Sequence, residues 1–257
     1  MFDPPWHPLR CSLKVDRAQR HLRDAQERVR EFQESNPHKV LIEPQTNVES
    51  LAQFQIPLLQ VGQNPPPSLA GPVGDCLQNY KSALDHAVHH LWVLYGGSGR
   101  EGLYRVEFPI FSNAKAYASK RDALIGGLTP LQRTFIDDLQ PYLGLEIPQR
   151  RVLWMLHELA RIDRHRHVHL VSHALAGSSL RVTPLTDDLE PLADPTVGFN
   201  RVALEVTLDI RVIVNEPSVG VFPLEEGLRE IEFVVRAILH FLATGEYPPD
   251  AITTSDA

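Results

Sequence analysis

The sequence predicts an α+β protein that is mainly helical, a helical bundle carrying a small antiparallel β-sheet. Apolar residues recur at spacings of three and four over several long segments, and one later segment alternates between apolar and polar residues. The repeated strand–helix–strand order of a parallel sheet is absent from the sequence, so a dinucleotide-binding α/β fold is not expected. The 257 residues are enough for one well-buried core. We expect a single domain over residues 1–245 with β insertions and a flexible tail over 246–257.

Six segments carry the helical periodicity, and the two in the middle are short. They span residues 13–35, 75–95, 113–124, 129–139, 150–175 and 225–243. The Pro/Gly-rich stretch 62–74 predicts a loop, after which Asp75 stands where a helix N-cap is expected. Gly96-Gly97 ends the second helix, and Gly177 follows the end of the long fifth helix.

The segment Val202–Val214 carries the strongest strand pattern, with an apolar residue at every even position and mostly polar residues between them. This alternation predicts a long half-buried strand or one arm of a hairpin, with the even-numbered residues packed on the helices. Shorter strands are expected at 39–42, 51–61 and 180–183. Pro57 restricts the second of these to a sheet edge, and we expect it to pair antiparallel with Val202–Val214.

Composition and charge exclude several classes of function. The chain holds 25 Lys and Arg against 32 Asp and Glu, a formal net charge of −7, whereas a broad nucleic-acid surface needs an excess of cations. No DNA partner is therefore expected, although a local basic cleft is compatible with this balance. Apolar runs end before the roughly 18 residues of a membrane span, and without an export signal the expected location is cytoplasmic. Cys11 and Cys76 match no metal-binding spacing, which is typical of reduced thiols.

Histidine is unusually frequent, with 12 residues, and most of them fall within the windows 86–90 and 157–173. On the second predicted helix, the first window lies on a face of short or titratable groups, opposite the apolar face. On the fifth, Asp163 and Arg166 interrupt the apolar face, and buried charges are costly unless they are paired. We therefore expect the two helices to pack with these stretches facing each other and Asp163 to lie close to an arginine or a histidine. The alternative is a solvated face and a simple Asp163–Arg166 ion pair.

Three stretches of the chain resemble the signatures of a family of uncharacterised bacterial and phage-borne helical proteins. They are GDCLQNYKSALDH (Gly74–His86), Phe108-Pro109-Ile110 and LHELARIDRHR (Leu156–Arg166). The family's first and last signatures read roughly GD-x-LHN-LRSALDH and I-DKHR. This chain departs from them at Gln78, at Tyr80-Lys81 and at Arg164, where the family has His, Leu-Arg and Lys. The resemblance implies a shared fold over most of the chain. It implies no activity, because none is established for the family.

A weaker resemblance is to the HEPN superfamily, helical bundles that are often metal-independent ribonucleases and commonly dimers. Their motif is an arginine followed, after four to six residues, by a histidine. It occurs here as Arg164–His169, Arg161–His167 and Arg166–His173. Arg166 and His173 are seven apart and share one face of the predicted helix. The resemblance implies RNA as a partner, a homodimer, and catalysis without a metal or another cofactor.

These features predict a polar pocket that binds an anionic ligand, above all RNA phosphate. A histidine there would move the proton of a 2′-hydroxyl group, while an arginine would hold the phosphate and stabilise its developing charge. The candidate catalytic residues are Arg166, His173, His165, Arg164 and His169. The candidates for binding or orienting the substrate are Asn79, Asp85, His86, Asp163 and Arg161.

Two other classes of function fit the same residues. Histidines four apart share a helical face and suit a metal site in a bundle, as His86 and His90 do, or His165 and His169, but the neighbouring arginines repel a cation. Alternatively, the chain is a non-catalytic dimerising or adaptor protein whose polar cluster serves only its core. Mutual pairing of these side chains away from solvent would favour that structural interpretation.

Overall fold

The computed structural model describes residues 11–35, 39–46, 53–60, 64–95, 106–174, 179–184, 202–207 and 210–248. The helices of this part are α1 (Ser12–Glu34), α2 (Ala70–Tyr95), α3 (Ala114–Ile125), α4 (Pro130–Asp138), α5 (Pro148–Asp163) and α6 (Leu224–Thr244), with 3-10 turns η2 (Pro67–Leu69) and η4 (Pro141–Leu143). Its strands are β1 (Lys39–Thr46), β2 (Gln53–Gln60), β3 (Leu170–Ala174), β4 (Ser179–Pro184), β5 (Val202–Thr207), β6 (Ile210–Glu216) and β7 (Gly220–Pro223). The prediction of a mainly helical α+β fold is confirmed.

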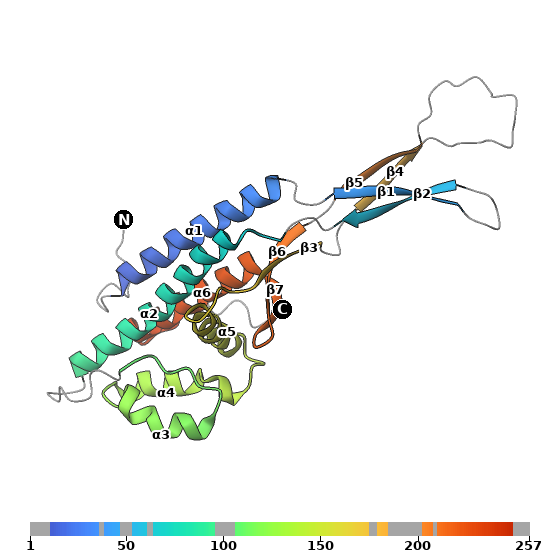
Figure 1. Ribbon diagram of the computed structural model, residues 1–257. Helices are drawn as coiled ribbons and strands as arrows, with labels where there is room; N and C mark the ends of the chain where they lie inside the picture. The colour runs from blue at the N-terminus through green and yellow to red at the C-terminus, as the bar shows by residue number, and fades with distance from the viewer. Residues whose placement is uncertain are drawn as a thin grey trace, which may run out of the picture.

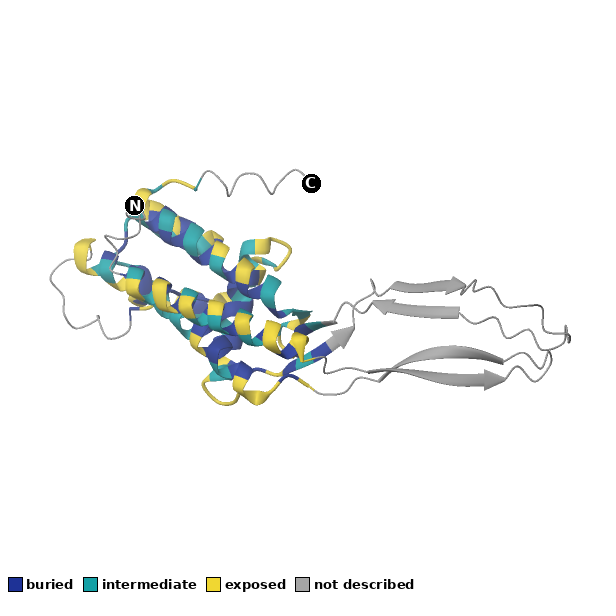
Figure 2. Ribbon diagram, turned by 90° about the horizontal axis from the view of Figure 1, so that it is seen from above, coloured by how far each residue is buried: buried dark blue, intermediate teal, exposed yellow. Residues whose placement is uncertain are grey.

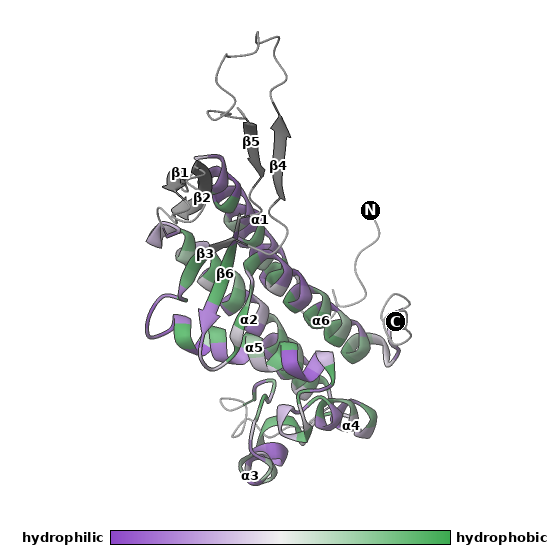
Figure 3. Ribbon diagram, turned by 90° about the vertical axis from the view of Figure 1, so that its right-hand side faces the viewer, coloured by the Kyte–Doolittle hydropathy of each residue, from purple (hydrophilic) through white to green (hydrophobic). Residues whose placement is uncertain are grey.

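Four helices form the bundle, and α2 contacts the other three, α1, α5 and α6 (Figure 1). Each helix buries the face that its periodicity predicts. On α1 the buried residues recur at spacings of three and four from Val15 to Phe32. Figure 2 shows such buried positions alternating with exposed ones along the helices, and Figure 3 shows the hydrophobic colour along α6 and β6. One hydrophobic core therefore runs through the helices and onto the sheet.

The short helices α3 and α4 lie at the end of the bundle away from the β-hairpins (Figure 1). The Asn113 side chain caps α3 by accepting the backbone N–H of Ala116 at 2.9 Å. Arg121 binds the Asp137 carboxylate through two nitrogens and the Tyr117 hydroxyl donates to it, which ties α3 to α4. Burial alone would raise the pKa of Asp137, but these hydrogen bonds hold it below its usual value. The ion pair thus fixes α3 in place beside α4.

The main sheet is antiparallel, in the order β3-β6-β7. Within it, Leu170 of β3 lies opposite Val214 of β6. Val212 and Val214 of β6 are buried, as the alternation predicts, but so are Ile213 and Glu216, which the alternation over Val202–Val214 does not place on the buried face. The expected burial of the even positions at 202–210 concerns side chains outside the described residues.

The predicted pairing of Val202–Val214 with the 51–61 region is wrong. Val202–Val214 forms parts of two strands, β5 and β6, and β2 pairs with β1 while β5 pairs with β4. Each of these hairpins joins strands that follow one another along the chain, so closing its loop costs less entropy than the longer-range pairing that we expected. Both hairpins lie beyond the end of the bundle at which α1 ends (Figure 1).

α2 begins at Ala70, so Asp75 lies inside the helix and is not the predicted N-cap. Pro72 is tolerated because it falls in the first turn, where a backbone N–H has no partner within the helix. Gly74 leaves room for the Asp163 side chain. A Cβ atom at this position would lie 1.8 Å from Oδ1 of Asp163, so a larger residue would displace that carboxylate.

α5 ends at Asp163, and the prediction that this helix continues to residue 175 is wrong. The backbone N–H groups of His165 and Arg166 still donate to the Ile162 carbonyl, and the chain then extends into β3. Apolar residues such as Leu170 are buried from this strand, as they would be from a helix, so periodicity does not reveal the break. The antiparallel pairing of Leu170–Ala174 with β6 makes this segment a strand and not a continuation of the helix.

Two further expectations concern the ends of the chain and the membrane. Gly245, with φ +78°, ends α6, and most of the expected tail 246–257 lies outside the described residues. Among the helices that the structure describes, none combines the length and the hydrophobicity needed to cross a bilayer.

Candidate functional site

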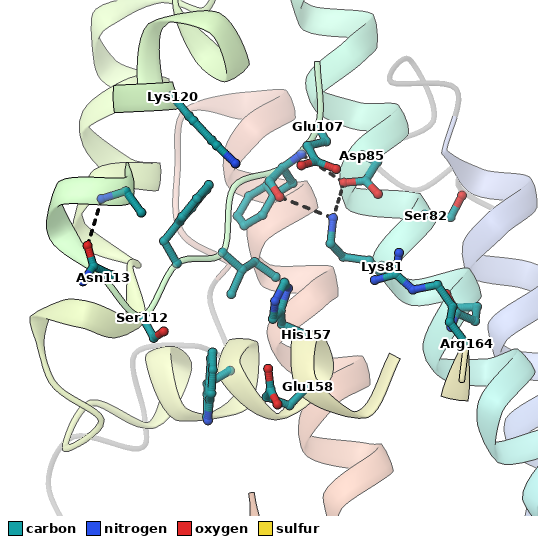
Figure 4. Close-up of a pocket in the computed structure, with 16 residues that line it drawn as sticks. Lys81, Ser82, Asp85, Glu107, Ser112, Asn113, Lys120, His157, Glu158 and Arg164 are labelled. Carbon is teal, nitrogen blue, oxygen red and sulfur yellow. Dashed lines mark hydrogen bonds and ion pairs between the residues drawn. The ribbon is translucent and has the colours of Figure 1, made fainter. Parts of the chain in front are cut away.

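A cavity of about 530 Å³ lies between α2, α5 and the segment 106–113 that leads into α3 (Figure 4). Its walls are mostly polar. The charged and titratable residues that line it are Lys81, Asp85, Glu107, Lys120, His157, Glu158 and Arg164. The aromatic residues that line it are Phe108, Phe111 and Trp154.

The wall formed by α2 is held by an ion pair that also fixes the neighbouring segment. Lys81 Nζ binds Asp85 Oδ1, and the same carboxylate oxygen accepts the backbone N–H of Phe108 at 3.0 Å. Lys81 also lies 3.4 Å from the Phe108 carbonyl oxygen. On the far side of the segment, the buried Gln140 accepts the backbone N–H of Phe111 at 3.1 Å. The Phe108-Pro109-Ile110 stretch is thus fixed, and the Lys81 charge is largely neutralised.

The wall formed by α5 carries a histidine that is held in its neutral form. Burial, followed by the positive charges of Lys81, Arg164 and Arg161, lowers the pKa of His157, although Glu158 acts in the opposite direction. Glu158 is itself buried and paired. Arg161 donates to its two carboxylate oxygens at 3.2 and 2.6 Å, which lowers the pKa of Glu158 despite its burial. His157 is therefore a neutral imidazole beside several cations.

Two of the lining cations have no carboxylate partner among the residues that the structure describes. Lys120 comes from α3 and lies 5.8 Å from the centre of the Phe111 ring, while Arg164 follows the end of α5 and its Nε lies 3.4 Å from the Ala160 carbonyl. Figure 4 shows the two side chains entering from opposite sides of the cavity, with Lys81 and His157 between them. Among the described residues neither of them enters an ion pair, so both charges are available to a ligand.

Two of the predicted site residues, Asp85 and Arg164, line this cavity. Three others, Arg161, His165 and Arg166, line a second cavity of about 350 Å³. These five of the ten predicted residues are therefore divided between two cavities, and of the other five, the four whose side chains the structure describes line neither of them.

In the second cavity, Arg166 has a structural partner that the sequence did not reveal. Its two terminal nitrogens donate to Glu216 at 2.8 and 2.6 Å, and Glu216 also accepts the backbone N–H of His169 at 2.7 Å. The Glu216 side chain is 1% exposed. Burial alone would raise the pKa of Glu216, but these contacts hold it below its usual value. Arg166 thus fastens the turn after α5 to the end of β6.

The expected contact between the two signature stretches is confirmed, but the expected partner of Asp163 is wrong. Gln78 Nε2 donates to Asp163 Oδ2 at 3.2 Å and to the Ala160 carbonyl at 2.6 Å. Within the described part of the chain, Asp163 forms no ion pair with an arginine or a histidine. The alternative Asp163–Arg166 ion pair is also not formed, because Arg166 binds Glu216. The Gln78 amide therefore donates a hydrogen bond to the half-buried Asp163 carboxylate, and no second charged group is needed there.

The polar face of α2 does not converge on a single site. Asn79 donates to the backbone carbonyl of Asp75 on its own helix, and Asp75 lies 3.9 Å from His21 of α1. His86 is exposed, and its pKa is lowered by partial burial and then by the charge of Lys14, which is also on α1. Asp75 and His86 therefore lie near α1, whereas Asp85 lines the first cavity.

The helical face that Arg166 and His173 were expected to share does not exist, because the helix ends before both. His173 belongs to β3, opposite Arg211 in the register, and its side chain lies outside the described residues. His169 is exposed, with Nδ1 3.2 Å from the Asn215 carbonyl. The spacing argument for a metal site at His165 and His169 is wrong for the same reason. Among the described residues, no three His, Cys, Asp or Glu side chains are grouped to bind a metal ion.

Among the residues of the first cavity that the sequence did not predict are Lys81, Lys120, Trp154 and His157. A signal was present for His157, since it is seven residues before Arg164 and therefore two turns away on the same side of α5. Lys81 lies within the first signature stretch. Nothing in the sequence connects Lys120 with α5.

Comparisons with known proteins add no relative. The chain matches no protein-family model, and neither the curated proteins nor the solved structures include a significant match.

Proposed function

We propose that this protein binds RNA, with its phosphate groups held in the cavity between α2, α3 and α5. The observation that carries the proposal is that Lys120 and Arg164 face one cavity and have no carboxylate partner among the described residues. Arg164 would bind a phosphate through its planar guanidinium group, and Lys120 would contact a neighbouring phosphate as a point charge. The neutral His157 between them can donate or accept one hydrogen bond.

The phosphate contact is assigned to Arg164, whereas the sequence predicts it at Arg166. Arg166 is already bound at both terminal nitrogens by the buried Glu216, so a phosphate would have to displace that carboxylate. Arg164 needs no such exchange. The net charge of −7 argues against a broad basic surface. Lys120 and Arg164, which have no ion-pair partner in the described ranges, would therefore form a local basic site in the cavity. RNA cleavage by this protein, with a histidine as the acid or base, remains a proposal that the same samples can test in the presence of EDTA.

The test is the affinity for a fluorescein-labelled single-stranded oligouridylate of about ten nucleotides, followed by anisotropy at several salt concentrations. We expect Lys120→Ala and Arg164→Ala each to weaken binding about 10-fold, because each variant loses one phosphate contact. Each should also reduce the slope of log affinity against log salt by roughly 0.7, the value for one released counterion on a single strand.

The matched controls are Lys115→Ala on α3 and Arg20→Ala on α1, both exposed residues outside the cavity. They remove the same charges and should leave the affinity within about 2-fold, because interactions between exposed charges at long range are screened. Equal losses in the control and cavity variants, or unchanged binding by the cavity variants, would reject this site.

A further inference from the structure

We propose that Trp154 is a stacking surface for an unpaired base, so that the ligand of this cavity is single-stranded RNA. This inference rests on the proposed function, because it names the class of nucleic acid that the same cavity accepts. It assigns a role to an aromatic residue that takes no part in the phosphate contacts.

The position of the Trp154 ring is fixed before any ligand arrives. Its indole N–H donates to the Ser218 carbonyl in the β6–β7 turn at 3.3 Å. On α5 itself, the His157 ring lies nearly parallel to it, with an angle of 23° between the planes and 5.9 Å between the ring centres. Trp154 is half-buried, and it is one of the residues that line the cavity. A ring held in this way loses little conformational entropy when a base stacks on it.

Aromatic rings line the same cavity as the two cations, Lys120 and Arg164, that have no carboxylate partner in the described part of the chain. Lys120 lies over the Phe111 ring, and Arg164 follows α5, which carries Trp154 and His157. Proteins that bind single strands combine cations for the backbone with aromatic faces for the bases. A volume of about 530 Å³ suits a small ligand such as one nucleotide. In a duplex the bases are stacked and paired, so their faces could not reach Trp154.

The experiment compares Trp154→Leu, which removes the aromatic face, with Trp154→Phe, which retains one. Affinities are measured for single-stranded oligouridylate, for an abasic oligonucleotide of the same length, for a duplex and for uridine monophosphate. For Trp154→Leu we expect a loss of about 10-fold for the single strand, the usual effect of one lost base–aromatic stack, and little change for the abasic strand. Trp154→Phe should retain most of the affinity. A free nucleotide that binds as tightly as the strand would identify a nucleotide site instead and overturn the proposal.

The outcomes separate this inference from the proposed function. If the wild-type protein binds the abasic strand or the duplex as tightly as the single strand, Trp154 does not read a base, although phosphate binding in the cavity stands. If it binds none of the probes, both proposals are wrong. Equal losses for the base-bearing and abasic strands in Trp154→Leu, with a lowered melting temperature, would show that Trp154 acts only through the fold and would overturn the inference.

Discussion

Replacing Arg166 with alanine is expected to lower the free energy of unfolding by about 2 kcal/mol. The variant would leave the carboxylate of Glu216, which is 1% exposed, with the His169 N–H as its remaining charge-stabilising contact. Breaking a fully buried pair costs roughly 3–5 kcal/mol. We expect less here, because the Arg166 side chain is 54% exposed and water can reach the vacated position. Urea denaturation measures the difference, and Arg164→Ala is the control, since its guanidinium has no carboxylate partner among the described residues.

The pH dependence of stability provides a second measure of the same pair. The folded-state pKa of Glu216 lies below its usual value, so its contribution is present above the unfolded pKa and is lost as the pH falls through the folded pKa. Arg166→Ala removes the main cause of that shift. Its stability deficit should therefore be largest near neutral pH and should shrink as the solution is acidified. If Arg166→Ala unfolds like the wild type and yet loses RNA binding, Arg166 is a phosphate contact, as the sequence first indicated.

Reversing the charges of Lys120 and Arg164 together should produce the largest effect on binding. We expect the double variant Lys120→Glu plus Arg164→Glu to lose affinity for single-stranded RNA by about 100-fold or more, because two attractive phosphate contacts become repulsive. The control is Lys115→Glu plus Arg20→Glu, which changes the net charge of the chain by the same amount. A similar loss in this control would mean that binding follows overall charge, and the cavity would not be the site.

The sequence predicts most of the helical bundle because the signal there is local. The apolar spacing on α1 runs from Val15 to Phe32, and the same positions are buried. The second and fifth predicted helices do meet, but the contact is made by Gln78 and Asp163, whereas the predicted polar face of the second helix, which carries Asp75 and His86, lies near α1. Periodicity identifies the buried face of each helix, but it does not identify the partner of each polar side chain.

The predictions from sequence are wrong where contacts with residues far away in the sequence determine the local structure. α5 stops at Asp163 because the following residues bind β6, about 50 residues further along the chain, through Arg166 and Glu216. The apolar alternation of Val202–Val214 contains a signal for this contact. If the pattern is continued by two residues beyond Val214, Glu216 falls on the buried face, and a buried carboxylate needs a cation. Lys120 reaches the cavity through the packing of α3 beside α4, which no pattern in its own segment indicates.

The central claim, that RNA phosphate enters the cavity beside His157, is tested most directly by the NMR titration of that histidine. The spectrum of His157→Gln identifies its signal among the 12 histidines. Burial and the neighbouring cations lower the pKa of His157 in the free protein, and a phosphate beside it would favour the charged form. We therefore expect saturating oligouridylate to raise the pKa of His157 and RNA binding to tighten as the pH falls through the interval between the two values. If RNA binds while the pKa of His157 stays unchanged, the ligand lies elsewhere.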